Sequence, residues 1–267
     1  MVTDPQPGDD RTPQRRMVLL GASNLTRAIG TVVSTARANV GEPLDLLVAM
    51  GFGRSYGMRT MFLGRELPGI LDCGLWRALE SRAPLPTVAL ITDIGNDVLY
   101  HAAPEQIVDW VNRCVDRFER IGARVVITEL PVCNFAALSW LRYMFFRTVY
   151  VPMCRLSIRE TIERATEVNR RVEQLAAQRG LTLVNQSAQW YGLDPIHIRR
   201  AHWSKAWRNM IAPLIDTDTS FDEALLNETL GLRLKLATPE ERRLIGLARR
   251  REQPVMRFDD GSRVSIY

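Results

Sequence analysis

The chain of 267 residues is 46% apolar and 24% charged, a composition typical of globular proteins with enough chain for one sizeable core. No window holds the roughly 18 uninterrupted apolar residues that a membrane-spanning helix needs; residues 136–153 come closest and are interrupted by Arg142 and Arg147. The formal charge of +5 permits an acidic partner, but charge alone is weak support for nucleic-acid binding, so no nucleic acid is expected.

Residues 1–16 and the cysteines bear on processing and compartment. The first sixteen residues hold three prolines and many charges without an apolar run, which predicts a disordered lead rather than a secretory signal. The four cysteines are scattered and form no CxxC or Cys/His cluster, so neither a zinc site nor a disulfide framework is indicated. A reducing cytoplasm fits this pattern best.

The first half of the chain alternates between predicted strands and helices. Residues 17–22 form an apolar run that predicts a strand, and helical spacing follows as far as Val40, with Gly41 as the stop. A second buried strand is predicted over residues 44–50 and ends in a glycine-rich loop. A third, over residues 87–94, runs into Gly95-Asn96-Asp97.

The second half continues the alternation. We expect a helix over residues 104–121, a strand over 124–130, a long helix over 158–178 ended by Gly180, and a fifth strand over 181–186. Beyond residue 214 the chain predicts an appendage, with a helix over 239–251 and a terminal hairpin that turns at Asp260-Gly261. The expected organisation is therefore a lead (1–16), a catalytic domain (17–214) and a C-terminal appendage (215–267).

This alternation predicts an α/β fold with a mostly parallel five-stranded sheet that helices cover on both faces. In such sheets the ligand site lies beyond the carboxyl ends of the strands. The candidate site residues should therefore lie in the loops after these strands.

Ser23 stands where the first strand gives way to a helix. Its hydroxyl would project from the carboxyl edge of the sheet, close to the positive end of the helix, which suits a nucleophile. Serine is also a good helix N-cap at such a position, and the local pattern leaves that alternative open.

Asp194-Pro195-Ile196-His197 follows the last predicted strand. An Asp three residues before a His can fold back so that its carboxylate orients the imidazole as a base. A surface turn rich in Asp and Pro is the alternative. The chain has two other histidines, His101 and His202, and neither has a comparable Asp partner, so His197 is the candidate general base.

Two loops offer hydrogen-bond donors at the same edge. The side-chain amide of Asn96 could donate into the cleft or shape a turn. In the loop 51–57, the absence of a Cβ lets Gly51 or Gly53 bring a backbone N–H close to an oxyanion. The same loop does not match a phosphate-binding motif.

Four blocks in sequence order, Gly21-Ala22-Ser23-Asn24, the glycine loop, Gly95-Asn96-Asp97 and Asp194-x-x-His197, resemble the signature blocks of the SGNH (GDSL-like) hydrolase family. The resemblance covers roughly residues 17–214. It marks a divergent member, because most of the family has Asp directly before the serine and Gly four residues after it, where this chain has Ala22 and Arg27.

The resemblance implies a flavodoxin-like three-layer α/β/α fold and the metal-independent hydrolysis of acyl or acetyl esters, with no cofactor. Carried over by position, Ser23 is the nucleophile, His197 the base and Asp194 its orienting partner. The oxyanion hole consists of the backbone N–H groups of Ser23 and Gly53, with Gly51 as the competitor, and of the Asn96 side chain.

Two other functions fit the same residues. The first is an acyltransferase that passes the acyl group to an alcohol. The second is a non-catalytic module that holds an anionic ligand with the arginines at positions 54, 59, 199 and 200. The aromatic segment 136–153 could be a lid, an acyl-chain groove or the surface of a homo-oligomer, or simply an amphipathic helix on the core.

Overall fold

The computed structural model describes residues 12–132, 134, 139–150, 154–215 and 228–267. Most of the expected disordered lead, residues 1–11, lies outside the described residues, as do parts of the aromatic segment. In chain order the helices and strands are β1 (Arg15–Leu20), α1 (Ser23–Val40), β2 (Leu44–Ala49), β3 (Thr60–Phe62), β4 (Arg65–Leu67), α2 (Leu75–Ser81), β5 (Thr87–Ile91), α3 (Asn96–Leu99), α4 (Pro104–Glu119), β6 (Arg124–Thr128), α6 (Trp140–Tyr150), α7 (Ile158–Arg179), β7 (Thr182–Val184), α8 (Trp203–Ile211), α9 (Glu228–Leu236), β8 (Glu241–Leu244), β9 (Leu247–Arg250), β10 (Met256–Arg257) and β11 (Arg263–Ile266).

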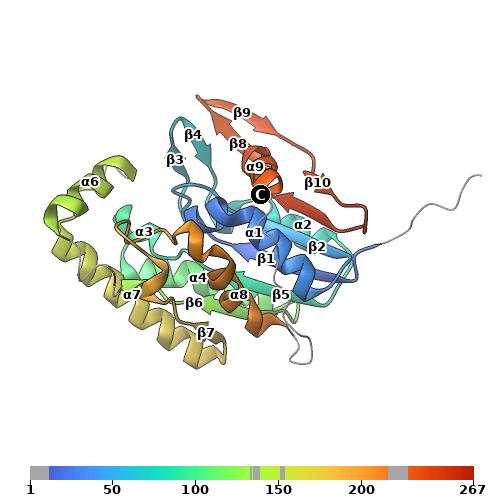
Figure 1. Ribbon diagram of the computed structural model, residues 1–267, viewed down its shortest axis with the longest axis horizontal. Coiled ribbons are helices and arrows are strands. Elements are labelled where there is room, and N and C mark those ends of the chain that lie inside the picture. Colours follow the sequence, from blue (N-terminus) through green and yellow to red (C-terminus); the bar gives the residue numbers. More distant parts are fainter. Residues whose placement is uncertain (1–11, 133, 135–138, 151–153, 216–227) are drawn as a thin grey trace, which may run out of the picture.

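The central sheet has the order β10-β11-β2-β1-β5-β6-β7, and every pairing is parallel except that of β10 with β11. Helices α2, α4 and α7 cover one face, and α1, α8 and α9 cover the other (Figure 1). The predicted α/β class with a mostly parallel sheet is thus confirmed, and all five predicted parallel strands are present.

The sheet has seven strands rather than the expected five. The two additional strands come from the chain beyond residue 214: the predicted hairpin at Asp260-Gly261 forms, and its second strand, β11, pairs in parallel with β2. Val264 and Ile266 of β11 are buried. The described end of the chain therefore belongs to the central sheet and contributes to its core.

Strand β1 begins at Arg15, two residues before the expected start. The reason lies in a buried ion pair, because the guanidinium of Arg16 lies 3.0 Å from the carboxylate of Asp45 on the neighbouring strand β2. Asp45 is fully buried and also pairs with Arg82 at 2.5 Å and Arg263 at 2.8 Å. One carboxylate thus joins β1, β2 and β11 to the loop after α2.

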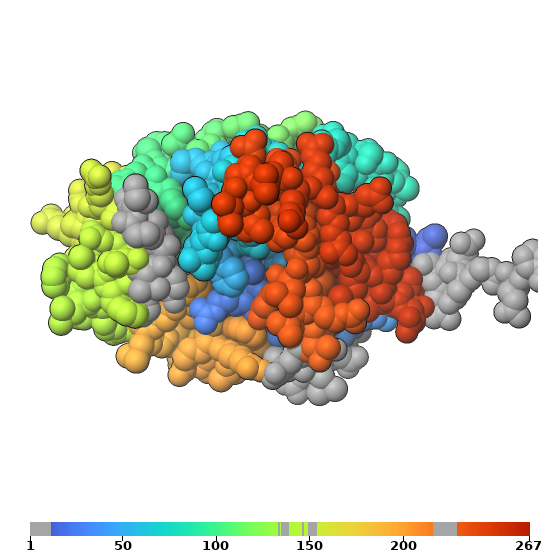
Figure 2. Space-filling view, turned by 90° about the horizontal axis from the view of Figure 1, so that it is seen from above, coloured from blue at the N-terminus to red at the C-terminus, as the bar shows by residue number. Residues whose placement is uncertain are grey.

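The helix expected over residues 239–251 is wrong, because this stretch forms the hairpin of β8 and β9. Its two-residue turn is Ile245-Gly246, both with positive φ, as tight hairpin turns require. β8 also pairs with β4, so β3-β4-β8-β9 form a second, antiparallel sheet. Seen from above, the red β8–β9 hairpin lies beside the light-blue β3–β4 hairpin, and α6 forms the left end of this face (Figure 2).

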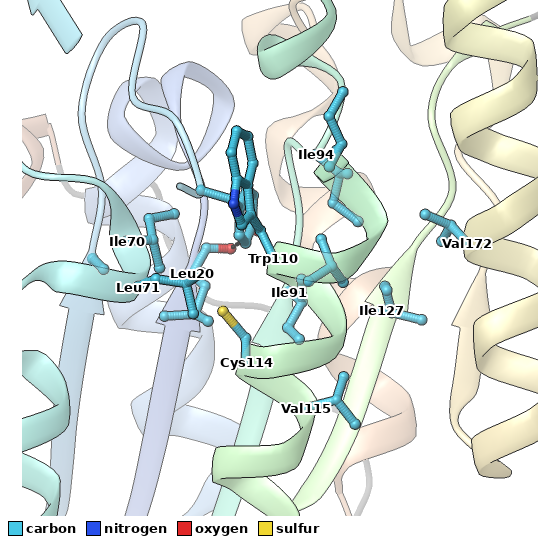
Figure 3. Close-up of a cluster of buried hydrophobic side chains, with 14 of the residues drawn as sticks. Leu20, Ile70, Leu71, Ile91, Ile94, Trp110, Cys114, Val115, Ile127 and Val172 are labelled. Carbon is cyan, nitrogen blue, oxygen red and sulfur yellow. Dashed lines mark hydrogen bonds between the residues drawn. The ribbon is translucent and has the colours of Figure 1, made fainter. Parts of the chain in front are cut away.

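The core on one face of the sheet is formed where strands and helices meet. Side chains of β1, β5 and β6 pack against helix α4, and Val172 of α7 adds the outer wall (Figure 3). Trp110 and Cys114 both lie on the inward face of α4. Successive side chains of a strand point to opposite faces of the sheet, so the core has two halves. In β1, Val18 and Leu20 face this side, whereas Met17 and Leu19 face α1.

Helix α7 shows why its predicted limits were close. Ser157 and Glu160 form a capping box at its start, and Gly180 ends it in the left-handed conformation.

Among the described residues, no helix combines the length and apolarity needed to cross a membrane. Of the cysteines, Cys73, Cys114 and Cys154 are buried free thiols, and Cys133 lies outside the described residues.

Candidate active site

Ser23 is the first residue of α1, at the carboxyl end of β1. The N-cap is Ala22, which has no capping side chain. The carboxylate of Asp93, two residues after the end of β5, takes this role instead and accepts hydrogen bonds from the backbone N–H groups of Ala22, Asn24 and Leu25 at 2.8, 3.1 and 3.2 Å. Ser23 is therefore not the helix cap, and its hydroxyl is free to face another partner.

That partner is His197. The Oγ of Ser23 lies 2.9 Å from Nε2 of His197, and Nδ1 of the same ring lies 2.7 Å from Oδ2 of Asp194. Because a carboxylate only accepts, Nδ1 donates to Asp194, and in the neutral form of the ring Nε2 is then the acceptor for the serine hydroxyl. Ser23 and His197 are both buried, with 8% and 5% of their surface exposed.

Asp194 is held by its own loop. Its Oδ1 accepts from the backbone N–H groups of Ile196 and His197 at 3.1 and 3.2 Å. Burial raises the pKa of Asp194, but hydrogen bonds from the His197 ring and these two N–H groups outweigh it, so the pKa lies below its usual value. The carboxylate is thus ionised at neutral pH and fixes the orientation of the ring.

Asn24 ties the serine end of the site to the histidine loop. Its Nδ2 donates to Oδ1 of Asp93 and to the backbone oxygen of Ile196, both at 2.9 Å, and its Oδ1 accepts from the N–H of Ile198 at 2.8 Å. The residues on either side of His197, Ile196 and Ile198, are therefore hydrogen-bonded through their backbone to the side chain of Asn24, the residue that follows Ser23.

Asn96 begins the short helix α3, and its amide makes one long hydrogen bond of 3.4 Å to the backbone oxygen of Arg54. Asn96 lines a pocket of about 600 Å³ together with Ser23, His197 and Gly53. Gly53 has a φ of 64°, and a Cβ there would come within 2.6 Å of Oη of Tyr100. Gly51 packs instead against Leu67.

A buried arginine anchors the loop that carries Gly53. Arg54 is fully buried and donates to the backbone oxygens of Met50, Pro68 and Tyr267. On the same loop, the N–H of Tyr56 donates to Asp97 at 3.0 Å, and burial raises the pKa of that carboxyl to about 7. Arg54 is therefore bound to the protein backbone, and it is not among the residues that line the two cavities around Ser23.

The other sequence candidates lie elsewhere. Arg59 pairs with Glu66 at 3.3 Å, and Arg199 donates to the backbone oxygen of Gln189. The ring of His101 accepts from the backbone N–H of Arg155. None of these residues, nor Arg200, is among those that line the two cavities around Ser23, and the alternative of an anion-binding module at these arginines stays a prediction.

A second cavity, of about 90 Å³, meets the first at Ser23, Asn96, Leu99 and Ile196. Apolar side chains from α7 and the loops after β5 and β6 dominate its lining: Ile94, Val98, Leu130, Pro131, Ile158, Ile162 and Ala165. Helix α6 adds Tyr143 and Arg147, whereas its Trp140, Leu141 and Phe145 are exposed. The aromatic segment thus contributes a wall to this cavity, and its role in a homo-oligomer stays a prediction.

No protein-family model matches the sequence, and no curated protein matches it. Solved structures do match. One covers 75% of this chain and 97% of its own, with 14% identity and a TM-score of 0.51. Others are a GDSL-like lipase from Bacteroides thetaiotaomicron (10% identity, 79% of this chain and 91% of that one, TM-score 0.47) and the psychrotrophic esterase EstA from Pseudoalteromonas sp. (13%, 73% and 94%, 0.44).

The chain is structurally similar to GDSL-like lipases and esterases. At these identities the likeness concerns the fold. In the part of the chain that the structure describes, no cluster of three or more His, Cys, Asp or Glu side chains is arranged to hold a metal ion.

Sequence reasoning missed Asn24 and Asp93. Asn24 directly follows the serine, and Asp93 lies near the carboxyl end of the strand predicted over residues 87–94, so both stood at the sheet edge that was expected to hold the site. A polar residue at the end of a buried strand was the available signal. The hydrogen bonds of Asn24, however, join residues far apart in the sequence, because Asp93 lies 69 residues and Ile196 lies 172 residues after it.

Proposed function

We propose that this protein is a serine hydrolase that cleaves a carboxylic ester through an acyl-enzyme. The observation that carries the proposal is the continuous hydrogen-bonded series from Ser23 through His197 to Asp194, with distances of 2.9 and 2.7 Å. A hydroxyl next to an oriented neutral imidazole is the arrangement that activates a serine for attack.

In the first half of the reaction, Oγ of Ser23 forms a bond to the ester carbonyl carbon as its proton moves to Nε2 of His197. The carbon–oxygen bond to the alcohol then breaks, and the alcohol leaves with the proton from Nε2. In the second half, water attacks the acyl-enzyme and gives its proton to Nε2, which returns a proton to Oγ of Ser23 as the acid leaves.

The negative charge on the carbonyl oxygen needs donors that are in place before the reaction. We assign this role to the backbone N–H groups of Ser23 and Gly53 and to the side-chain amide of Asn96. All three residues line the larger pocket, and the weak bond of Asn96 to Arg54 leaves its amide available. The apolar cavity on the other side of Ser23 suits the hydrocarbon part of the ester.

The test uses a fluorophosphonate probe, which reacts with activated serines, and a small chromogenic ester. We expect the native protein to be labelled and to hydrolyse the ester, and Ser23→Ala to lose both activities. Ser81→Ala, at an exposed serine far from the pocket, serves as the control and should retain both. Labelling that persists in Ser23→Ala would remove the assignment.

Product analysis with added alcohols separates hydrolysis from acyl transfer. If the free acid is the main product at every acceptor concentration, the hydrolase assignment stands. If the acyl group passes to the alcohol instead, the same site belongs to a transferase.

A further inference from the structure

The larger pocket beside Ser23 has two positively charged side chains in its lining. Arg27 of α1 and Arg65 of β4 both line it, and the remaining lining is apolar or carries the proposed catalytic groups. No Asp or Glu is among the described residues that line this pocket. Its walls are Phe52, Phe62, Leu63, Leu99, Tyr100 and Ile196.

Arg65 enters the pocket from the β3–β4 hairpin and is half-buried. Burial lowers the pKa of Arg65, and the charges of Arg242 and Arg54 lower it further. Among the described residues no carboxylate forms an ion pair with Arg65, and the buried Nε of the neighbouring Arg242 also has no hydrogen-bond partner there. A guanidinium that is partly desolvated among other cations is stabilised by an anion.

Arg27 of α1 lines the same pocket. Its guanidinium lies 3.7 Å from Oδ2 of Asp194, at the outer limit of an ion pair, and 36% of its side chain is exposed. Burial lowers the pKa of the nearby Lys235 on α9, and the charges of Arg200 and Arg27 lower it further, so positive charge continues outward from this wall. Of the two arginines that line the pocket, Arg27 thus has one distant carboxylate partner, and Arg65 has no carboxylate partner among the described residues.

We propose that the substrate of this enzyme is an ester that carries an anionic group, which Arg65 and Arg27 bind in the larger pocket. This inference rests on the proposed esterase function and adds to it the charge of the substrate. The ester carbonyl then lies at Ser23, and an apolar part of the molecule enters the smaller cavity on the other side. Arg is suited to this role because its planar donors match the oxygens of a carboxylate or a phosphate.

The experiment compares two pairs of esters of similar size. In the first pair the charge is on the alcohol part: 4-acetoxybenzoate against its neutral methyl ester. In the second pair the charge is on the acyl part: phenyl hydrogen adipate against phenyl hexanoate. We expect kcat/KM of the native protein to be higher for the charged ester of one pair, and that pair identifies which part of the substrate binds to the arginines.

The variants test which side chain is responsible. Arg65→Gln should lower the charged-to-neutral ratio of kcat/KM about tenfold, because a charge-assisted bond to the anion is lost. Arg65→Lys should retain part of the ratio. Arg243→Gln removes a charge from the adjacent strand β8, where Arg243 is exposed and lies 3.8 Å from Glu66, and should leave the ratio unchanged. A fluorophosphonate label on Ser23 shows that each variant keeps its site.

Neutral esters preferred in both pairs, or a ratio in Arg65→Gln equal to that of the native protein, would overturn the inference while the esterase function stands. If the native protein hydrolyses none of the four esters and the probe does not label Ser23, the proposed function itself fails. The two failures are therefore distinct.

Discussion

The position of Ser23 depends on Asp93, a residue with no expected part in the chemistry. Asp93 has a φ of 59°, a left-handed conformation that costs a non-glycine residue about 1 kcal/mol or more. The surrounding bonds offset this cost, because the carboxylate receives three backbone N–H groups of α1 and the amide of Asn24. By capping α1 in place of a serine, Asp93 leaves Oγ of Ser23 to His197.

The oxyanion assignment predicts a large effect at Asn96. We expect Asn96→Ala to lower kcat on a small ester by about 100- to 1,000-fold with little change in KM, because the lost donor acts on the transition state. Asn112→Ala, on the surface of α4, is the matched control, since its partner there is Arg179. An unchanged kcat in Asn96→Ala would contradict the role.

Asn24 is a positioning residue for His197, and a substitution that replaces its amide by a carboxylate tests this role. In Asn24→Asp the side chain can no longer donate to Asp93 and the backbone oxygen of Ile196, and it places a second negative charge beside Asp93. We expect kcat to fall about 10- to 100-fold, because small displacements of a catalytic base are costly. Steady-state kinetics beside Asn112→Asp measures this, and equal rates for the two variants would refute it.

The residues of the site differ in how far the sequence reveals them. Ser23, His197 and Asp194 stand out because a serine begins a helix after a buried strand and one of three histidines follows an Asp at the right spacing. Arg27 and Arg65 do not stand out, because charged residues are usually exposed and nothing local indicates a shared pocket. The pocket exists only through the pairing of distant segments.

At the scale of elements, periodicity predicted the five parallel strands and the helices α1, α4 and α7, because each depends on its own buried face. Helices α2, α8 and α9 were not predicted. The second sheet could not be predicted in this way. Residues 241–250 are rich in Arg and Leu, which favour helices, and pairing with β4 overrides that preference. The signal that was available is Ile245-Gly246, which matches Leu63-Gly64 of the β3–β4 hairpin as a two-residue turn with positive φ.

Asp45 holds three elements together, and its removal should be costly. Asp45→Asn leaves the guanidinium of Arg16, itself 2% exposed, without its charge partner. We expect the free energy of unfolding at pH 7 to fall by about 3 kcal/mol, as for other broken buried pairs. Urea unfolding measures this beside Asp109→Asn, where an exposed 3.9 Å pair with Arg113 is lost and little should change.

The same residue gives a pH dependence. Burial raises the pKa of Asp45, but its bonds with Arg263, Arg82 and Arg16 outweigh it, so the folded pKa lies below the ordinary value of 3.8. Its stabilising contribution is therefore complete above that value and is lost as the pH falls through the folded pKa. The difference between native protein and Asp45→Asn should shrink below pH 3.8, and a constant difference would contradict the assignment.

At the scale of the whole molecule, the net charge of +5 and the arginines around the pocket act in the same direction on an anionic ester. Attraction over such distances is screened by salt, with a Debye length of about 10 Å at 0.1 M. We expect kcat/KM for the charged ester to fall as sodium chloride is raised, and that of its neutral counterpart to stay level. Parallel salt profiles would show that the field does not guide binding.

The parallel pairing of β11 with β2 has a consequence for biosynthesis. β2 is made early, but its outer edge meets its neighbour only after residues 263–266 have been synthesised. Until then an apolar strand offers unpaired backbone groups to other nascent chains. The loop that carries Gly53 also depends on this late segment, because Arg54 donates a hydrogen bond to the backbone oxygen of Tyr267. Nascent chains stalled before residue 263 should therefore depend on chaperones and react poorly with a serine probe.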